Sequence, residues 1–339
     1  MHFAITTWLT AVAVALAAAV ATTTILRTLL ATGLAWRLAT DIPNERSLHT
    51  LPTPRVGGWG IVPVSVVALL WLAPRMWLIT AAAAGLAALS QVDDRRGLPA
   101  RVRFGAHLVA VVVLIAAYPA ATPWWLLAGV GFTMVWLTNL YNFMDGADGL
   151  AGGMALFGFG AYAAAALLGG PHPQSDLVAA GAAVAGAAFG FLLLNFHPAR
   201  LFLGDAGSIP LGFLAGALGY WGWREAIWPL WFTAMVFSPF IADASVTLAR
   251  RLLRGEKFWQ AHREHYYQKM VRSGIGHGRT AAYWYLVMLA GIIIALWALG
   301  RPVLQQWALF AAWYGVLACL GFAIDMRWRR AQTATDNNS

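Results

Sequence analysis

The sequence predicts an all-α polytopic membrane protein, folded as a single domain over residues 1–339. Three observations support this fold class. Apolar residues make up 60% of the chain, and its mean hydropathy is +0.64. Charged residues make up only 11%, against about 25% in a soluble globular protein. Apolar runs of the length that crosses a bilayer, about 20 residues per helix, recur from one end of the chain to the other.

Polar breaks divide these runs into about eleven expected transmembrane helices. The first run carries no charge before Arg27, so we expect a retained span and not a cleaved signal segment. Alanine and glycine dominate the interiors, as in Gly212-x-x-x-Gly216, which favours close helix packing in lipid. A polar C-terminal tail is expected over residues 326–339. The expected spans are 3–26, 57–73, 77–91, 105–118, 123–138, 150–168, 177–194, 209–223, 228–248, 281–299 and 303–324.

The distribution of charge predicts how the chain is oriented. Eleven spans place the termini on opposite sides, and all but three of the 23 Lys and Arg residues then fall on the side of the C-terminus. Basic loops stay in the cytoplasm. We therefore expect a bacterial inner-membrane protein with an external N-terminus and a cytoplasmic C-terminus. The net charge of +9 follows from this topology and from attraction to membrane lipids, and no nucleic-acid partner is expected.

Acidic residues gather on the same side as the basic ones. Of the 14 Asp and Glu residues, we place only Asp176 and Glu225 outside. Membrane insertion does not sort carboxylates in this way. Their position predicts a cytoplasmic active-site cleft.

Five expected cytoplasmic loops carry polar motifs. Alone, each motif is more often an ordinary turn, and a single histidine is more often a hydrogen-bonded structural residue than a ligand. Together, in order and on one face, they indicate a site. The motifs are Asp41 to His49 with Pro52 to Gly58; Asp93-Asp94-Arg95-Arg96 with Arg101 and Arg103; Asn139 to Gly152, containing Asn142, Asp145 and Asp148; Gly204-Asp205-Ala-Gly207-Ser208; and the basic loop 249–280 with His262-Arg263-Glu264-His265.

The residue types in these loops suit phosphoryl transfer with a hard cation. The neighbouring carboxylates of Asp93 and Asp94 repel each other unless a cation or an arginine lies between them. Mg²⁺ binds through one or two carboxylates together with substrate phosphates, and Asn142 offers a further oxygen. Arginines such as Arg101 and Arg103 suit phosphate groups. Catalysis of this kind depends on positioning and charge neutralisation.

The order of the motifs over residues 36–280 resembles the polyprenyl-phosphate N-acetylhexosamine-1-phosphate transferases of glycosyltransferase family 4. The resemblance implies a UDP-N-acetylhexosamine donor, undecaprenyl phosphate as acceptor, Mg²⁺ with Mn²⁺ as a possible substitute, and a possible homodimer. It implies that Asp205 binds the metal with Asn142 as a second ligand. Asp93 and Asp94 match the aspartate pair near the lipid phosphate, and Asp148 matches a uracil contact.

The candidate residues form three groups. The metal ligands are Asp205 and Asn142. The candidate catalytic residues are Asp93, Asp94, Asp145 and His265. The candidate substrate-binding residues are Asp148, Arg101, Arg103, Arg263, His49 and Asn139.

The fifth loop departs from the family pattern Arg-x-His-x-His-His. Here it has Arg263-Glu-His265-Tyr-Tyr267-Gln268, so tyrosine and glutamine replace two histidines. This predicts an altered sugar pocket. The extra His262 and the later His277 resemble the subgroup that starts O-antigen synthesis with 6-deoxy-N-acetylhexosamines. UDP-GlcNAc and UDP-GalNAc remain alternatives.

Two other classes of protein agree less well with the sequence. A secondary transporter carries its charges at the membrane midplane, whereas these acids lie at span ends. A CDP-alcohol phosphotransferase needs an Ala-Arg pair soon after Asp-Gly, which the segment after Asp148 lacks. We expect a single in-line displacement at the β-phosphorus of the donor. A two-step route through an aspartyl-phosphate on Asp93 or Asp94 stays open.

Overall fold

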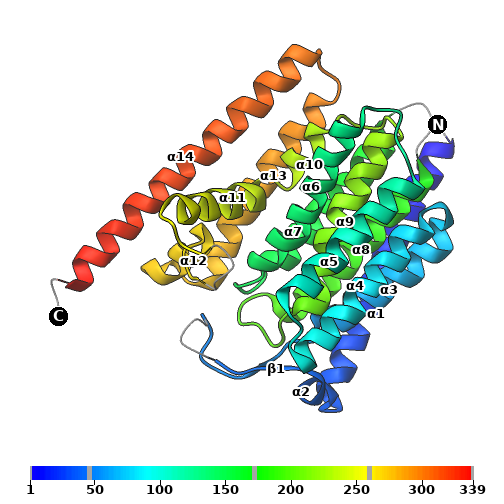
Figure 1. The fold of residues 1–339 in the computed structure, drawn as a ribbon. Helices are drawn as coiled ribbons and strands as arrows, with labels where there is room; N and C mark the ends of the chain where they lie inside the picture. Colours follow the sequence, from blue (N-terminus) through cyan, green and yellow to red (C-terminus); the bar gives the residue numbers. More distant parts are fainter. Residues whose placement is uncertain (1, 44–47, 170–173, 258–261, 337–339) are drawn as a thin grey trace.

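The computed structural model describes residues 2–43, 48–169, 174–257 and 262–336. It is a bundle of long helices, with one short antiparallel sheet in which β1 (Thr40–Asp41) pairs with β2 (Thr53–Pro54) (Figure 1). The predicted all-α class is confirmed.

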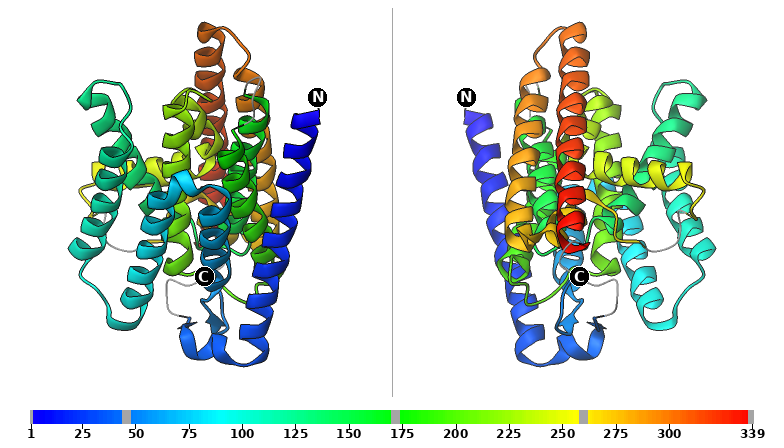
Figure 2. Two further views of the ribbon diagram at one scale, coloured as in Figure 1. Left: turned by 90° about the vertical axis from the view of Figure 1, so that its right-hand side faces the viewer. Right: turned by 90° about the vertical axis from the view of Figure 1, so that its left-hand side faces the viewer.

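Ten of the expected spans correspond to single helices. These lie side by side along one direction, as the two turned views show (Figure 2). They are α1 (His2–Ala31), α3 (Gly57–Leu72), α4 (Trp77–Arg96), α5 (Ala100–Ala117), α6 (Trp124–Phe143), α7 (Leu150–Leu168), α8 (Ser175–Asn195), α9 (Asp205–Arg224), α13 (His277–Ala298) and α14 (Val303–Asp336).

Seven of the described helices are long and apolar enough to cross a membrane, and α3 is a shorter apolar helix. The chain is therefore a multi-pass membrane protein. The total of eleven spans stays a prediction. Short elements connect the long helices: α2 (Leu34–Leu38), η1 (Pro74–Met76), α12 (Tyr266–Met270) and η2 (Val271–Ile275).

The expected span 228–248 is not one helix. It is divided into α10 (Trp231–Val236) and α11 (Ser238–Leu253), and α11 lies crosswise to the long helices (Figures 1 and 2). Pro239 stands in the first turn of α11, where its missing N–H is tolerated but where it cannot continue the preceding helix. Because of this break, Asp243 lies at the end of the bundle where the acidic loops lie.

The expected polar tail begins within α14, which remains helical to Asp336. Contacts with the segment after α11 hold α14 around Asp325 and Trp328. Asp325 pairs with Lys269 at 2.7 Å, and the guanidinium of Arg272 lies over the ring of Trp328 at 4.7 Å. The polar residues therefore form the far end of a helix.

Close contact between small residues in the bundle interior is confirmed at Gly212. A Cβ at this position in α9 would approach the carbonyl oxygen of Leu137 in α6 to 2.7 Å. Only glycine permits this approach of two helix backbones. The contact fixes α9 against α6, so the polar residues at the ends of these helices meet.

Candidate active site

Backbone contacts join the first and fourth polar motifs. The N–H groups of Gly57 and Gly58 donate to the carbonyls of Phe202 (2.8 Å) and Leu203 (2.9 Å). A Cβ on Gly58 would lie 2.5 Å from backbone atoms of Ala206, so the two segments can touch only where glycine stands. Because α9 begins directly afterwards, this junction fixes Asp205.

A polar cavity of about 430 Å³ opens beside this junction. Four of the five predicted loops line it, the basic loop 249–280 through Gln268 and His277, whereas the loop with Asp93 and Asp94 does not. The predicted residues His49, Asn142, Asp145, Asp148 and Asp205 all line it. Its other lining residues are Asp41, Leu48, Arg55, Gly146, Ala147, Phe202 and Gly204. Residues 44–47 of the first motif lie outside the described chain.

The carboxylates in the cavity lie close enough to repel one another electrostatically. Burial raises the pKa of the Asp145 carboxyl well above its usual range, and the negative charge of Asp205 raises it further. Asn142 lies beside them, and its Oδ1 accepts a 2.7 Å hydrogen bond from the hydroxyl of Ser208. A cation would relieve this repulsion.

The donor set suits Mg²⁺. In the part of the chain that the structure describes, no three His, Cys, Asp or Glu side chains converge as a complete metal site. Mg²⁺ needs no such cage, because it keeps water and substrate phosphates among its ligands. A carboxylate from Asp205 and an amide oxygen from Asn142 therefore fit this ion.

The aspartate pair at the end of α4 is divided between two arginines. Asp93 accepts from the N–H of Leu98 at 2.6 Å and from Arg103 at 3.0 Å. Asp94 lies 3.5 Å from Arg55, and its second carboxylate oxygen is buried without a partner. Asp93 thus stabilises the turn between α4 and α5, whereas one carboxylate oxygen of Asp94 has no hydrogen-bond partner.

Asp148 is held by two histidines. One carboxylate oxygen lies 2.7 Å from Nδ1 of His197 and accepts from the N–H of Ala199 at 3.2 Å. His277 accepts through its Nδ1 from the backbone N–H of Asp148 at 3.3 Å, and its ring stacks on that of His197 at 5.7 Å. The carboxylate is therefore fixed before any ligand arrives. Neither histidine was among the candidate residues.

The remaining candidates do not line the cavity. Arg101 is exposed in the first turn of α5, and Arg103 is engaged by Asp93. The amide of Asn139 donates to the Val135 carbonyl at 2.7 Å. Arg263 accepts from Arg272 through its carbonyl at 3.2 Å. Their substrate roles stay predictions.

His265 is buried behind the cavity, where its Nδ1 lies 3.0 Å from Oδ1 of Asp243. Asp243 also accepts from the N–H groups of Tyr266 (2.9 Å) and Tyr267 (3.1 Å). Sequence reasoning missed Asp243, although an aspartate inside an otherwise apolar run was a signal that could have found it. It fixes the start of α12, and with it Gln268.

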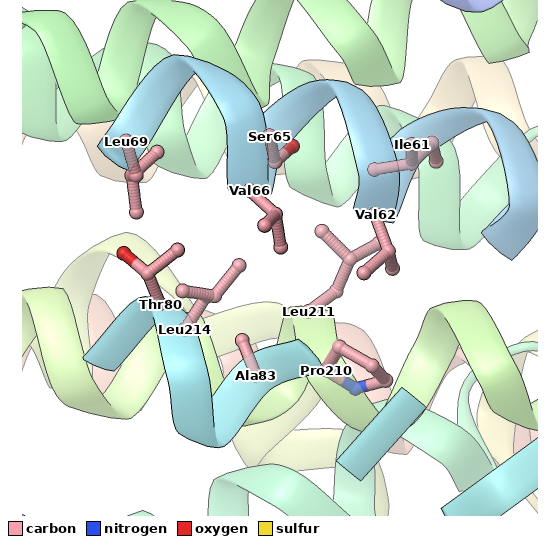
Figure 3. A pocket seen from close by; sticks show the side chains of 10 residues that line it. All are labelled: Ile61, Val62, Ser65, Val66, Leu69, Thr80, Ala83, Pro210, Leu211 and Leu214. Carbon is pink, nitrogen blue, oxygen red and sulfur yellow. The ribbon is translucent and has the colours of Figure 1, made fainter. Parts of the chain in front are cut away.

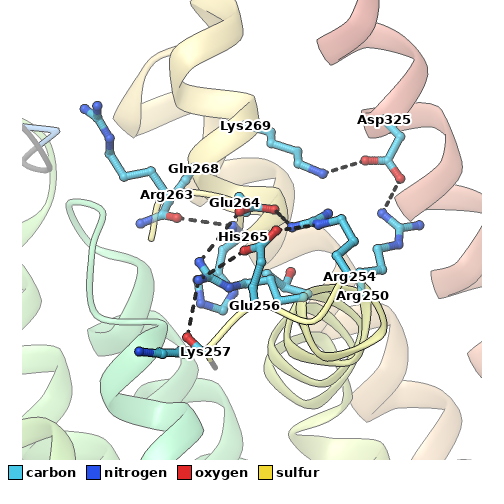
Figure 4. A network of polar contacts seen from close by, with 12 residues as sticks. Arg250, Arg254, Glu256, Lys257, Arg263, Glu264, His265, Gln268, Lys269 and Asp325 are labelled. Atoms are coloured by element: carbon cyan, nitrogen blue, oxygen red, sulfur yellow. Dashed lines mark hydrogen bonds and ion pairs between the residues drawn. The ribbon is translucent and has the colours of Figure 1, made fainter. Parts of the chain in front are cut away.

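A second polar network secures the same segment from outside (Figure 4). Arg254 pairs with Glu256 at 2.6 Å and with Glu264 at 2.5 Å. Arg250 and Lys269 meet at Asp325 of α14, at 2.6 and 2.7 Å. The segment that supplies Gln268 to the cavity is therefore attached to both α11 and α14.

Known proteins resemble this chain over most of its length. Residues 76–222 match the model described as Glycosyl transferase family 4. The chain is 27% identical over 268 residues to a probable undecaprenyl-phosphate N-acetylglucosaminyl 1-phosphate transferase of Bacillus subtilis (strain 168), covering 74% of each chain. It is 29% identical over 301 residues to a decaprenyl-phosphate N-acetylglucosaminephosphotransferase of Mycobacterium tuberculosis (strain ATCC 25618 / H37Rv), covering 75% of this chain and 74% of that one. It is 31% identical over 235 residues to a phospho-N-acetylmuramoyl-pentapeptide-transferase of Heliobacterium modesticaldum (strain ATCC 51547 / Ice1), covering 60% of this chain and 72% of that one.

Proposed function

The chain belongs to glycosyl transferase family 4, and from this premise we propose that it transfers an N-acetylhexosamine 1-phosphate from a UDP-sugar to undecaprenyl phosphate. The products are undecaprenyl-pyrophosphate-sugar and UMP. The observation that carries the proposal is the cavity in which Asn142, Asp145 and Asp148 of one loop meet Asp205 of another. The names of the relatives support a transferase over a transporter or a CDP-alcohol phosphotransferase.

Mg²⁺, or Mn²⁺ in its place, would be held by Asp205 and Asn142. When bound, such an ion neutralises charge on the donor pyrophosphate. Support comes from the mutual repulsion of the buried carboxylates and from the oxygen-only donor set. The protein's own part is to hold these oxygens on two helix ends, α6 and α9, that a glycine contact locks together.

The donor and acceptor would approach the cavity from different sides. Asp148, fixed by His197 and the N–H of Ala199, would accept from the uracil. Arg55 beside Asp94 would meet the phosphate of the lipid acceptor. An oxygen of that phosphate then attacks the β-phosphorus, the α–β anhydride bond breaks, and the electron pair leaves with UMP. The bond between the sugar carbon and its oxygen stays intact.

The sugar pocket differs at one position that faces the cavity. Of the two residues that replace histidines, Gln268 lines the cavity, whereas Tyr267 is buried and its hydroxyl donates to the Phe143 carbonyl at 3.1 Å. This supports an altered contact with the sugar and agrees with a 6-deoxy-N-acetylhexosamine. The product would start O-antigen or another cell-envelope polysaccharide. The site would face the cytoplasm of the inner membrane, as the basic loops indicate.

The test uses UDP-sugars that carry ³²P at the β-position, with undecaprenyl phosphate and purified protein. We expect the label to enter the lipid product and UMP to be released. A panel of UDP-GlcNAc, UDP-GalNAc and a UDP-6-deoxy-N-acetylhexosamine identifies the donor. Label recovered in UDP would show that the enzyme attacks the sugar carbon, and would contradict the proposal.

A further inference from the structure

Two parts of the cavity lining are held in place in different ways. Asp205 begins α9, which packs against α3 and α4 through apolar side chains such as Leu211 and Leu214 (Figure 3). A residual space of only about 10 Å³ remains between these three helices. Asp148 lies instead in the turn between α6 and α7, and polar contacts with α13 and with the segment after α8 hold it there.

The backbone at Asp148 and Gly149 is fixed by side chains from two other helices. The N–H of Gly149 donates to Oδ1 of Asn195 at 2.9 Å, and its carbonyl accepts from the hydroxyl of Tyr285 at 2.6 Å. The N–H of Asp148 donates to Nδ1 of His277 at 3.3 Å. These partners stand 46 to 136 positions away in the chain, so tertiary contacts decide where the turn lies.

The carboxylate of Asp148 is held through one of its two oxygens. Oδ2 lies 2.7 Å from Nδ1 of His197 and accepts from the N–H of Ala199 at 3.2 Å. Oδ1 lies 3.5 Å from Nδ1 of His277, but that nitrogen already accepts from the backbone N–H of Asp148. Among the residues that the structure describes, none donates a hydrogen bond to Oδ1. Because Asp148 lines the cavity, Oδ1 is the oxygen left for a ligand.

The partners of the two histidines assign them opposite tautomers. A carboxylate only accepts, so Nδ1 of His197 carries a proton. A backbone N–H only donates, so Nδ1 of His277 is unprotonated and its proton lies on Nε2, which donates to the Leu48 carbonyl at 3.2 Å. His277 therefore joins the third loop to the first, and His197 joins it to the segment that leads into α9.

We propose that His197 and His277 are positioning residues for the nucleobase of the donor. His197 fixes the rotation of the Asp148 carboxylate and His277 fixes its backbone, so that Oδ1 accepts from the N3–H of uracil. The inference rests on the proposed function, in which Asp148 contacts the uracil. An acceptor that is ordered before binding loses no further conformational freedom when the ligand arrives. Both histidines therefore contribute to donor affinity and not to the transfer step.

The first test separates the two contacts of His277. His277→Asn keeps an acceptor near the position of Nδ1, whereas His277→Gln keeps a donor near the position of Nε2. We expect His277→Gln to raise the Kd for UMP and the KM for the UDP-sugar about tenfold, and His277→Asn to stay within about threefold of wild type. The kcat and the KM for undecaprenyl phosphate should change in neither variant. Equal losses, or the opposite ranking, would overturn the assignment of His277.

The second test is a double-mutant cycle in which UMP is titrated into purified protein in detergent. His197→Ala should raise the Kd for UMP about tenfold in the wild-type background and should have no further effect in an Asp148→Ala background. A residue that acts only through Asp148 has nothing left to position there. His197→Asn, which keeps a donor near Nδ1, is the matched variant and should recover most of the lost affinity. Equal factors in the two backgrounds would overturn the proposal.

General destabilisation and failure of the proposed function have different signatures. A lowered thermal unfolding midpoint, together with raised KM values for both donor and acceptor, would show that the histidines only support the fold, and would overturn the positioning role. If the proposed function itself is wrong, the wild-type protein neither binds UMP nor transfers a sugar 1-phosphate.

Discussion

Replacing Asp243 by alanine removes the acceptor on which the start of α12 depends. The N–H groups of Tyr266 and Tyr267 lose their partner, and both residues are buried. Each unsatisfied buried donor costs about 1–3 kcal/mol, so the folded arrangement of this segment should be destabilised by about 2–6 kcal/mol. His265 loses its contact as well.

Loss of order at the start of α12 should also affect the cavity, because Gln268 directly follows Tyr267 and lines the cavity. A shift of 2 kcal/mol changes the ratio of ordered to open segment about 30-fold. We expect faster amide exchange at Tyr266 and Tyr267, and a fall in turnover of similar size. Thr247→Val is the matched control, because Thr247 donates to the same carboxylate at 3.2 Å and its loss costs about 1 kcal/mol.

Hydrogen exchange and turnover are measured on both variants after purification in one detergent. If Asp243→Ala exchanges these amides as slowly as the wild-type protein and turns over as fast, the carboxylate does not organise the segment. A thermal unfolding midpoint near that of wild type, combined with fast local exchange, would show that the effect is confined to this segment.

Two further predictions concern the metal and the orientation. Asp205→Asn should insert and purify normally but lose Mg²⁺ binding and turnover, since an ion that neutralises the pyrophosphate contributes several kcal/mol at the transition state; near wild-type activity at saturating Mg²⁺ would refute the ligand assignment. In a variant lacking Cys319, which is exposed, a cysteine at Arg95 should react only from the cytoplasm and one at Gln174 only from outside. External labelling at Arg95 would reverse the proposed topology.

Sequence patterns found most of the long helices, because a bilayer imposes a length and an apolar composition on every segment that crosses it. They failed at residues 228–248, where hydropathy continues across a break in the backbone. The proline at 239 ends one helix direction and starts another, and an apolar run does not record that change. The polar composition of the tail did not indicate that its first part continues α14 as a helix.

For the candidate site as well, the sequence predicted some residues correctly and others not. Asp148 and Asp205 were evident from the sequence because they stand in polar motifs on the same expected face, and both line the cavity. His265 was also conspicuous in the sequence, yet it lies buried on Asp243. A sequence motif shows which chemical groups are present, but it does not show which side chains face the same cavity.

The sequence by itself determined that this chain crosses a membrane many times, and it predicted that the acids, amides and arginines of the polar loops share one side. Composition and local pattern suffice for this, because insertion acts on each segment separately. Only the tertiary structure decided that one carboxylate oxygen of Asp94 is buried without a partner and that two histidines hold Asp148. The histidine contacts join residues 49 and 129 positions apart, and packing of whole helices creates them.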